Sequence, residues 1–223
     1  MPRLARTVFP NIPHHITQRG NRREDVFFTD KDREVYLKWL GEYCKKWKVD
    51  ILAYCLMTNH IHLILRPTTK EGLQRALKPL HMRYAQRINK SKGWKGHLWQ
   101  GRFFSSPLDE AYTWSALRYV ERNPVRAKMV EKSEDYPWSS ASFHCGLVKN
   151  PLLTPSHLED VISQEKWSDW LALPESEKTI HVLRRNIEKG LPCGADEFIE
   201  KLEKLANKPL KFRPQGRPTS QKG

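Results

Sequence analysis

Residues 49–66 have the sequence VDILAYCLMTNHIHLILR, which predicts two neighbouring antiparallel strands. The first strand is expected over Val49 to Leu56 and the second over Asn59 to Arg66, because both stretches are rich in residues that favour strands. The Met57-Thr58 step between them allows only a tight connection. This hairpin commits the first part of the chain to an antiparallel sheet.

The second of these strands has two chemically different faces. Successive side chains of a strand point to opposite sides, so His60, His62 and Ile64 share one face. The residues of the other face are all isoleucine or leucine. That face is expected in the core, and the two histidines therefore point away from it together.

The segments around the hairpin complete an α+β pattern. Thr29 and Asp32 resemble a capping pair that opens a helix, and Pro79 is expected to kink or split the helix in which it lies. The order βαββαβ, followed by one more helix, predicts a ferredoxin-like antiparallel sheet with helices packed on one face. The flanking elements are expected as a strand over His15 to Arg19, a helix over Lys70 to Asn89, a strand over His97 to Ser105 and a helix over Asp109 to Arg122.

The chain divides into three parts by its patterning. Residues 1–140 carry the α+β pattern, and residues 141–207 are expected to form a helical C-terminal extension. Helical stretches are expected there around Pro155 to Leu173 and Glu175 to Leu205. Residues 208–223 hold five basic residues and no acidic one, which predicts a flexible basic tail.

The composition is that of a globular protein with a strongly basic surface. Hydrophobic residues make up 39% of the 223 residues, and 39 Lys and Arg against 25 Asp and Glu give a net charge of +14. Such an excess favours a polyanionic partner. No segment is apolar enough for a membrane span or a signal peptide, so a soluble cytoplasmic protein is expected. Reduced core thiols, with neither a disulfide nor a zinc knuckle, are expected at Cys44, Cys55, Cys145 and Cys193.

The two outward histidines are candidate metal ligands. Their Cβ atoms lie about 7 Å apart on one strand face, so both imidazoles can converge on one divalent ion. A bare His-x-His is nevertheless more often a pair of surface histidines on an amphipathic strand. The motif alone leaves both interpretations open.

The segment RYVERNPVRA, residues 118–127, supplies a candidate nucleophile. Tyr119 and Asn123 are four residues apart on the expected helix and share a face, whereas Leu117 and Val120 lie away from it. A partly exposed phenol beside a carboxamide suits a nucleophile with a metal ligand or orienting group. Taken in isolation, a half-buried tyrosine and a helix-capping asparagine explain the pair equally well.

Three other tyrosines compete for the nucleophile's role. Tyr84 falls on the apolar stripe of its helix, which indicates a core residue. Tyr54 lies in a buried strand. Tyr112 shares the face of Tyr119 and is expected to pack beside it without contacting the substrate.

The segments HITQRGN, AYCLMTNHIHLIL, LWQGRF, RYVERNPVRA and YPWSS, in this order and spacing, resemble the REP-associated tyrosine transposases. These enzymes are relatives of the IS200/IS605 transposases within the HUH endonucleases. The later stretch GLPCGADEFIEKLE and the terminal GRP resemble the group's C-terminal extension. The resemblance therefore covers nearly the whole chain.

The resemblance implies a role for each candidate residue. His60 and His62 would hold Mg²⁺ or Mn²⁺, Tyr119 would be the nucleophile, and Asn123 would be a further ligand or assisting residue. Insertion-sequence relatives carry a glutamine in the last role, so Asn123 marks the REP-associated branch. Residues 1–140 would be the catalytic domain, acting on single-stranded and hairpin DNA with no small-molecule cofactor beyond the metal.

Two further function classes remain open from the sequence. The same basic surface suits a nucleic-acid-binding regulator without catalysis, and the same metal site suits a hydrolase that activates water. The presence of Tyr119 beside the histidine motif favours a transposase that nicks and joins single strands through a 5′-phosphotyrosine. The residues expected to contact DNA through charge or stacking are Arg19, Arg22, Arg23, Arg83, Arg87, Trp99, Arg102 and Arg126, with Phe103 beside Trp99.

Overall fold

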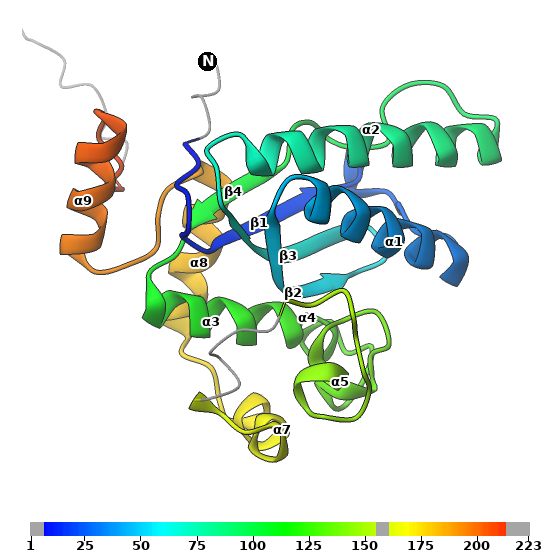
Figure 1. Cartoon of the computed structure of the whole chain (residues 1–223). Coiled ribbons are helices and arrows are strands. Elements are labelled where there is room, and N and C mark those ends of the chain that lie inside the picture. The colour runs from blue at the N-terminus through cyan, green and yellow to red at the C-terminus, as the bar shows by residue number, and fades with distance from the viewer. Residues whose placement is uncertain (1–6, 155–160, 213–223) are drawn as a thin grey trace, which may run out of the picture.

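A computed structural model describes residues 7–154 and 161–212 (Figure 1). Its centre is a four-stranded antiparallel sheet, which confirms the predicted α+β class. The strand order β2-β3-β1-β4 is that of a ferredoxin-like sheet. The strands are β1 (His14–Arg19), β2 (Val49–Leu56), β3 (His60–Pro67) and β4 (Phe104–Pro107).

The pairing of β1 with β3 fixes what lies on each face of the sheet. Thr17 lies opposite His62, and Arg19 lies opposite His60. Residues directly opposite each other in an antiparallel pair point to the same face. The polar side of β1 therefore joins the histidine side of β3.

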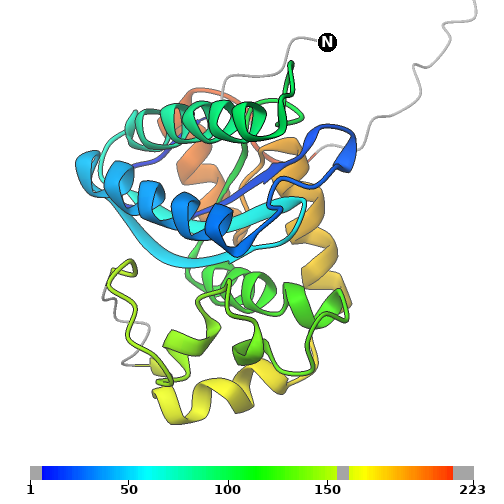
Figure 2. The ribbon, with the colours of Figure 1, turned by 90° about the vertical axis from the view of Figure 1, so that its right-hand side faces the viewer.

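Two long helices cover the apolar face of the sheet (Figures 1 and 2). They are α1 (Asp30–Lys46) and α2 (Gly72–Lys92), and their inner side chains form one core cluster with Ile61, Leu63 and Leu65. The predicted capping box opens α1, since Thr29 and Asp32 each accept a hydrogen bond from the other's backbone.

The structure corrects two expectations along this part of the chain. Helix α2 continues through Pro79, so the split that was one of the two expected effects does not occur. Packing of Leu77 and Leu80 into the core on either side offsets the hydrogen bond that proline removes. The fourth strand is Phe104–Pro107 rather than His97 to Ser105, because residues 97–103 form a loop. This loop makes an isolated bridge between Trp99 and Gly20, just after β1, and accepts a hydrogen bond from Gln18 at Gly101.

Helices were expected on one face of the sheet, and the structure adds cover on the other. Helix α3 (Glu110–Glu121) packs Ala116, Leu117 and Val120 against Ala53 and Ile64 of that second face. It is followed directly by the short α4 (Asn123–Arg126), with Pro124 at its start. The histidine face is therefore enclosed instead of open to solvent.

The segments after α4 pack around the layer that α3 and α4 form. The helix predicted over Glu175 to Leu205 is two helices in the structure. Gly190, with φ +66°, ends the first of them. The chain between the two helices then forms backbone hydrogen bonds at Cys193 with Pro107 and Asp109, at the end of β4. Residues 155–160, where another helix was expected to begin, and 213–223 of the tail lie outside the described residues. The remaining elements are η1 (Asn21–Arg23), η2 (Ser133–Asp135), α5 (Ala141–His144), α7 (Gln164–Ala172), α8 (Glu177–Lys189) and α9 (Asp196–Ala206).

Two further expectations concern thiols and membranes. All four cysteines are free; Cys44, Cys55 and Cys193 are buried as expected, whereas Cys145 is only partly buried. Among the described residues, no helix combines the length and the apolar character that crossing a bilayer requires.

A buried carboxylate ties α3 to the segments that follow it. Glu121 is fully buried and accepts hydrogen bonds from Ser140 Oγ at 2.5 Å and Trp167 Nε1 at 2.9 Å. It also pairs with His144 Nδ1 at 2.6 Å. These partners lie before and within α5 and in α7. Glu121 therefore joins the end of α3 to both helices.

We expect Glu121→Ala to lower the free energy of unfolding by about 3–5 kcal/mol, because it leaves His144 and the Trp167 N–H buried without a partner. Chemical denaturation measures this loss. Glu131→Ala, at an exposed position, is the matched control and should stay within about 0.5 kcal/mol of the wild type. Equal stability of the two variants would contradict the structural role of Glu121.

Candidate active site

One cavity of about 570 Å³ gathers the candidate residues of the sequence. His60 and His62 reach it from β3, and Tyr119 and Asn123 reach it from α3 and α4. Residues 60 and 123 are far apart along the chain. Their meeting follows from the packing of α3 on the histidine face of the sheet.

Both histidines are held through one ring nitrogen. His60 Nδ1 lies 2.6 Å from Asn59 Oδ1, so this nitrogen donates to the amide oxygen. His62 Nδ1 lies 2.9 Å from Nε2 of His15, a neighbour on β1. The two ring centroids are 5.0 Å apart. The Nε2 atom of each ring is thereby left for a ligand.

Burial keeps these imidazoles neutral. Desolvation, assisted by Arg19, lowers the pKa of His60 to about 4. Burial also lowers the pKa of His15 to about 3, and burial together with His60 places the pKa of His62 well below its usual range. Neutral rings with free lone pairs are the form in which histidine binds metals.

Tyr119 lies against the histidines and is more enclosed than the sequence suggested. Its ring centroid is 5.6 Å from that of His62 and 5.8 Å from that of His15. The side chain is 7% exposed, whereas a partly exposed phenol was expected. The contact with His15 and His62 explains this burial.

Asn123 lines the same cavity. Its amide nitrogen donates to the carbonyl oxygens of Tyr119 at 3.0 Å and Val120 at 3.4 Å. Both hydrogen bonds engage nitrogen, which leaves Oδ1 for a ligand. Pro124 has no N–H to continue the α3 ladder, and the carbonyl oxygens at the end of α3 are shared: Arg126 also donates to that of Tyr119, and the Arg122 N–H to that of Val120.

The donor set fits a hard divalent cation with help from water. Two imidazole nitrogens and one amide oxygen can supply three ligands, and each is already oriented by a second group, as metal ligands in proteins usually are. In residues 7–154 and 161–212, no group of three His, Cys, Asp or Glu side chains is arranged so that it could hold a metal ion by itself. The amide of Asn123 is therefore essential to any three-ligand set built on the two histidines.

The structure adds residues that the sequence interpretation missed. His15 was included in the first expected strand without a role, and its closeness to His62 follows from the pairing of β1 with β3. Helix α8 brings Arg184, Ile187 and Glu188 to the cavity wall. Because α8 returns from more than sixty residues away, no local pattern in the sequence could indicate this contact.

The residues expected to contact DNA lie in different places. Arg19 and Arg23 line the cavity of Tyr119. Arg126 stacks its guanidinium on the Tyr119 ring at 4.2 Å and pairs with Glu175 at 2.6 Å. Arg126 therefore packs behind the tyrosine.

The other expected contacts lie outside this cavity. On α2, Arg83 lies over the Trp39 ring at 4.0 Å and near Glu42, and Arg87 pairs with Asp32, so both face α1. Trp99 and Phe103 are 7% and 5% exposed, and the Trp99 N–H donates to the carbonyl of His81. Arg102 lines a second cavity beside them.

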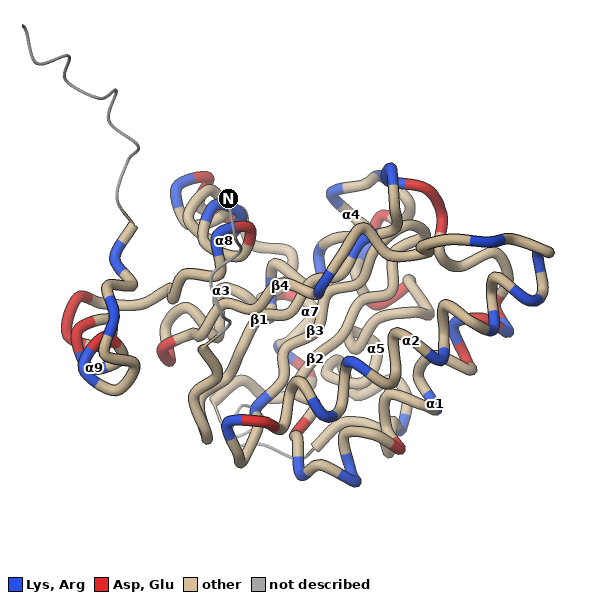
Figure 3. Tube along the Cα trace, turned by 90° about the horizontal axis from the view of Figure 1, so that it is seen from above, with Lys and Arg blue, Asp and Glu red and all other residues tan. Residues whose placement is uncertain are grey.

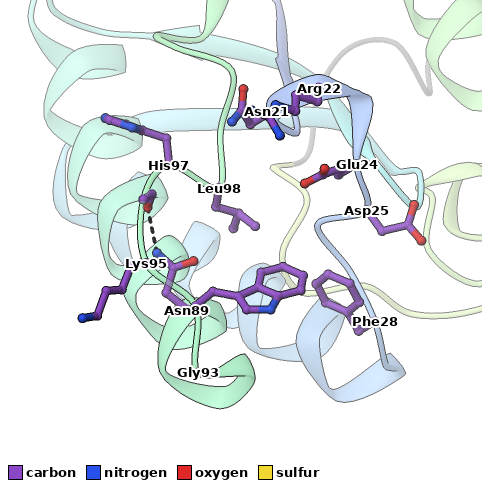
Figure 4. Close-up of a pocket in the computed structure, with 12 residues that line it drawn as sticks. Asn21, Arg22, Glu24, Asp25, Phe28, Asn89, Gly93, Lys95, His97 and Leu98 are labelled. Atoms are coloured by element: carbon purple, nitrogen blue, oxygen red, sulfur yellow. Dashed lines mark hydrogen bonds between the residues drawn. The ribbon is translucent and has the colours of Figure 1, made fainter.

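Arg22 lines a separate and larger cavity of about 1100 Å³ (Figure 4). Glu24 and Asp25 share this cavity with Lys95 and His97, so its charge is mixed. Neither histidine of β3 lines this cavity, and no tyrosine does. Despite its size, it lacks the groups that nucleophilic chemistry requires.

The charges around the Tyr119 cavity favour an anion. Arg19, Arg23 and Arg184 line it against a single carboxylate, that of Glu188. Away from this cavity, helix α2 on the opposite face of the sheet carries only basic charges, whereas α9 carries both signs (Figure 3). A phosphate group would be attracted into this cavity over most of its rim.

The competing tyrosines lie elsewhere. Tyr84 is fully buried and donates to the carbonyl of Val26 at 2.7 Å, which confirms its core role. Tyr54 is 4% exposed in β2, as expected. Tyr112, on the first turn of α3, does not line the cavity of Tyr119.

The matching family covers the strand, tyrosine and asparagine residues of this cavity but not its α8 wall. Residues 8–123, just over half of the chain, match the family described as Transposase IS200 like. The chain belongs to this family of transposases. The match begins before β1 and ends at Asn123.

Two individual relatives indicate which branch of the family the chain resembles. A Haemophilus influenzae protein assigned as a REP-associated tyrosine transposase is 24% identical over 152 residues, which span 60% of this chain and 85% of that protein. A solved REP-associated tyrosine transposase bound to a REP hairpin matches with a TM-score of 0.55 and 17% identity, over 70% of this chain and 92% of its own. These comparisons confirm the resemblance to REP-associated tyrosine transposases, the second of them through the fold.

We expect His15→Phe to weaken the binding of Mn²⁺ by roughly 10- to 100-fold, because it removes the nitrogen that orients His62 while keeping a ring of similar size. Isothermal titration calorimetry measures the affinity. His97→Ala removes an imidazole outside the cavity and serves as the control. Unchanged affinity in His15→Phe would show that His62 needs no such support.

Proposed function

We propose that this chain is a metal-dependent single-strand DNA endonuclease and strand-transferase that acts on REP-type hairpins through a 5′-phosphotyrosine. The observation that carries the proposal is the contact of the Tyr119 ring with His62 inside one cavity that Asn123 also lines. The solved relative bound to a REP hairpin supports the choice of DNA. Residues 1–140 would form the catalytic domain, with residues 141–207 as its helical extension.

The chemistry follows from a phenol oriented beside a phosphate-binding cavity. Tyr119 Oη attacks the scissile phosphorus, forms the Oη–P bond and breaks the P–O3′ bond. The phenol gives its proton to water, and water returns a proton to the 3′ oxygen, which leaves as a free 3′-OH. The phosphodiester energy is retained in the tyrosine ester. A 3′-OH can therefore reverse the step and join strands without ATP.

The other residues of the cavity hold the reacting groups. Arg126 stacks on the phenol ring and limits its rotation. Arg19 and Arg23 supply positive charge at the rim for the phosphate backbone. His60, His62 and Asn123 would hold Mg²⁺ or Mn²⁺, which when bound neutralises charge on the scissile phosphate.

Tyr119→Phe should abolish the covalent DNA adduct while hairpin binding persists, because only the phenolic oxygen is removed. Incubation with a labelled REP hairpin and Mn²⁺, followed by a denaturing gel, detects the adduct. Tyr112→Phe, on the same helix, is the control and should form the adduct normally. An adduct formed by Tyr119→Phe would move the nucleophile elsewhere, and strand cleavage without any adduct in the wild type would indicate a water-activating hydrolase.

His60→Ala and His62→Ala should each remove cleavage, and the double variant should be little worse than either. Half of a two-histidine metal site binds little metal, so the two losses do not add. Excess EDTA should give the same loss in the wild type, with recovery on added Mn²⁺. Full cleavage in EDTA would contradict metal dependence.

A further inference from the structure

Helix α8 closes one side of the Tyr119 cavity, although it lies outside the family match, which ends at residue 123. Arg184, Ile187 and Glu188 line the cavity from this helix. Their spacing of three and four residues places them on one helical face. The side of α8 that faces the tyrosine is thus a continuous surface.

Both ends of α8 are fastened to the catalytic layer. Before the helix, Glu175 pairs with Arg126 at 2.6 Å and Arg122 at 3.4 Å. After the helix, the backbone of Cys193 bonds to Pro107 at the end of β4. The position of α8 over the cavity is therefore set by contacts at both ends, independently of Arg184.

Arg184 reaches the reacting atom itself. Its Nε–H donates to the Tyr119 phenol oxygen at 3.3 Å. Its guanidinium carbon is 5.8 Å from the ring centroid, compared with 4.2 Å for Arg126, which stacks on the ring. The two arginines thus hold the tyrosine differently, one behind its ring and one at its oxygen.

The guanidinium of Arg184 keeps further donors for a substrate. Within the described part of the chain, no carboxylate lies within ion-pair distance of it, whereas Arg122 and Arg126 both pair with Glu175. Arg184 is exposed at the cavity rim, so water covers its other N–H groups in the free protein. A DNA strand that displaced this water would strengthen its interaction with phosphate charge.

We propose that Arg184 is a catalytic residue of the transfer reaction, supplied by the C-terminal extension. This inference rests on the proposed function. As the Tyr119 Oη–P bond forms and the P–O3′ bond breaks, the phenol proton leaves to water. The Nε–H of Arg184 holds the phenol oxygen in place, and its terminal N–H groups donate to the phosphate oxygens on which charge develops. In the joining direction the same contact stabilises the phenolate that departs.

The test compares Arg184→Ala with Lys178→Ala, which removes an exposed positive charge from the same helix away from the cavity. The single-turnover rate of adduct formation is measured with saturating labelled REP hairpin and Mn²⁺, and the hairpin Kd is measured separately. Arg184→Ala should lose roughly 10- to 100-fold in rate at saturation, as expected when a donor aimed at developing charge is removed. Lys178→Ala should keep the wild-type rate.

Two further measurements separate chemistry from folding and from simple DNA binding. Millimolar guanidinium, at constant ionic strength, should raise the rate of Arg184→Ala but not that of the wild type. Arg184→Lys keeps the charge without the planar fork and should lie between the wild type and the alanine variant. Equal thermal stability of the three proteins places the loss in the reaction.

The outcomes are distinct. A wild-type rate in Arg184→Ala, or a change confined to Kd, would overturn this inference and leave the proposed function standing. A loss that guanidinium does not rescue, together with a lowered Tm, would assign Arg184 a structural role and also overturn it. If the wild type forms no adduct at all, the proposed function fails and this inference fails with it.

Discussion

The antiparallel pairing of β1 with β3 is the constraint on which the site depends. Its register puts Thr17 opposite His62 and Arg19 opposite His60. A slip of one residue would turn every side chain of β3 to the other face and bury both histidines beneath α1 and α2. The apolar face of β3 prevents this, because the slip would also remove three fully buried aliphatic side chains from the core that they form with α1 and α2. The position of the histidines is thus secured by the hydrophobic core behind them.

Helix α3 connects the histidine face of the sheet with the second half of the chain. Tyr119 and Glu121 lie two residues apart and point to different sides of the helix, one into the cavity and one into the cluster with His144 and Trp167. A buried carboxylate is costly unless it is fully hydrogen-bonded, and Glu121 has three partners. The direction of α3, and with it the direction of Tyr119, is therefore set partly by α5 and α7.

The cavity is lined by residues from inside the family match and by residues from beyond it. The family match supplies the strand histidines, the tyrosine and the asparagine, while α8 supplies Arg184 from beyond it. The fold is shared with a solved relative at only 17% identity. At this identity the comparison shows a shared arrangement of elements. The contact of α8 with the tyrosine belongs to the part of the chain beyond the family match.

The sequence by itself determined the element order, the two faces of β3 and the candidates His60, His62, Tyr119 and Asn123. These follow from local periodicity, capping and resemblance, each of which is written in neighbouring residues. Only the tertiary structure decided that α3 and α8 cover the histidine face, that β4 begins at Phe104, and that Arg83 and Arg87 lie on the α1 side, outside the cavity. Contacts such as that of Arg184 with Tyr119 join residues 65 positions apart. They depend on how layers pack, and packing is a property of the whole chain that no single segment encodes.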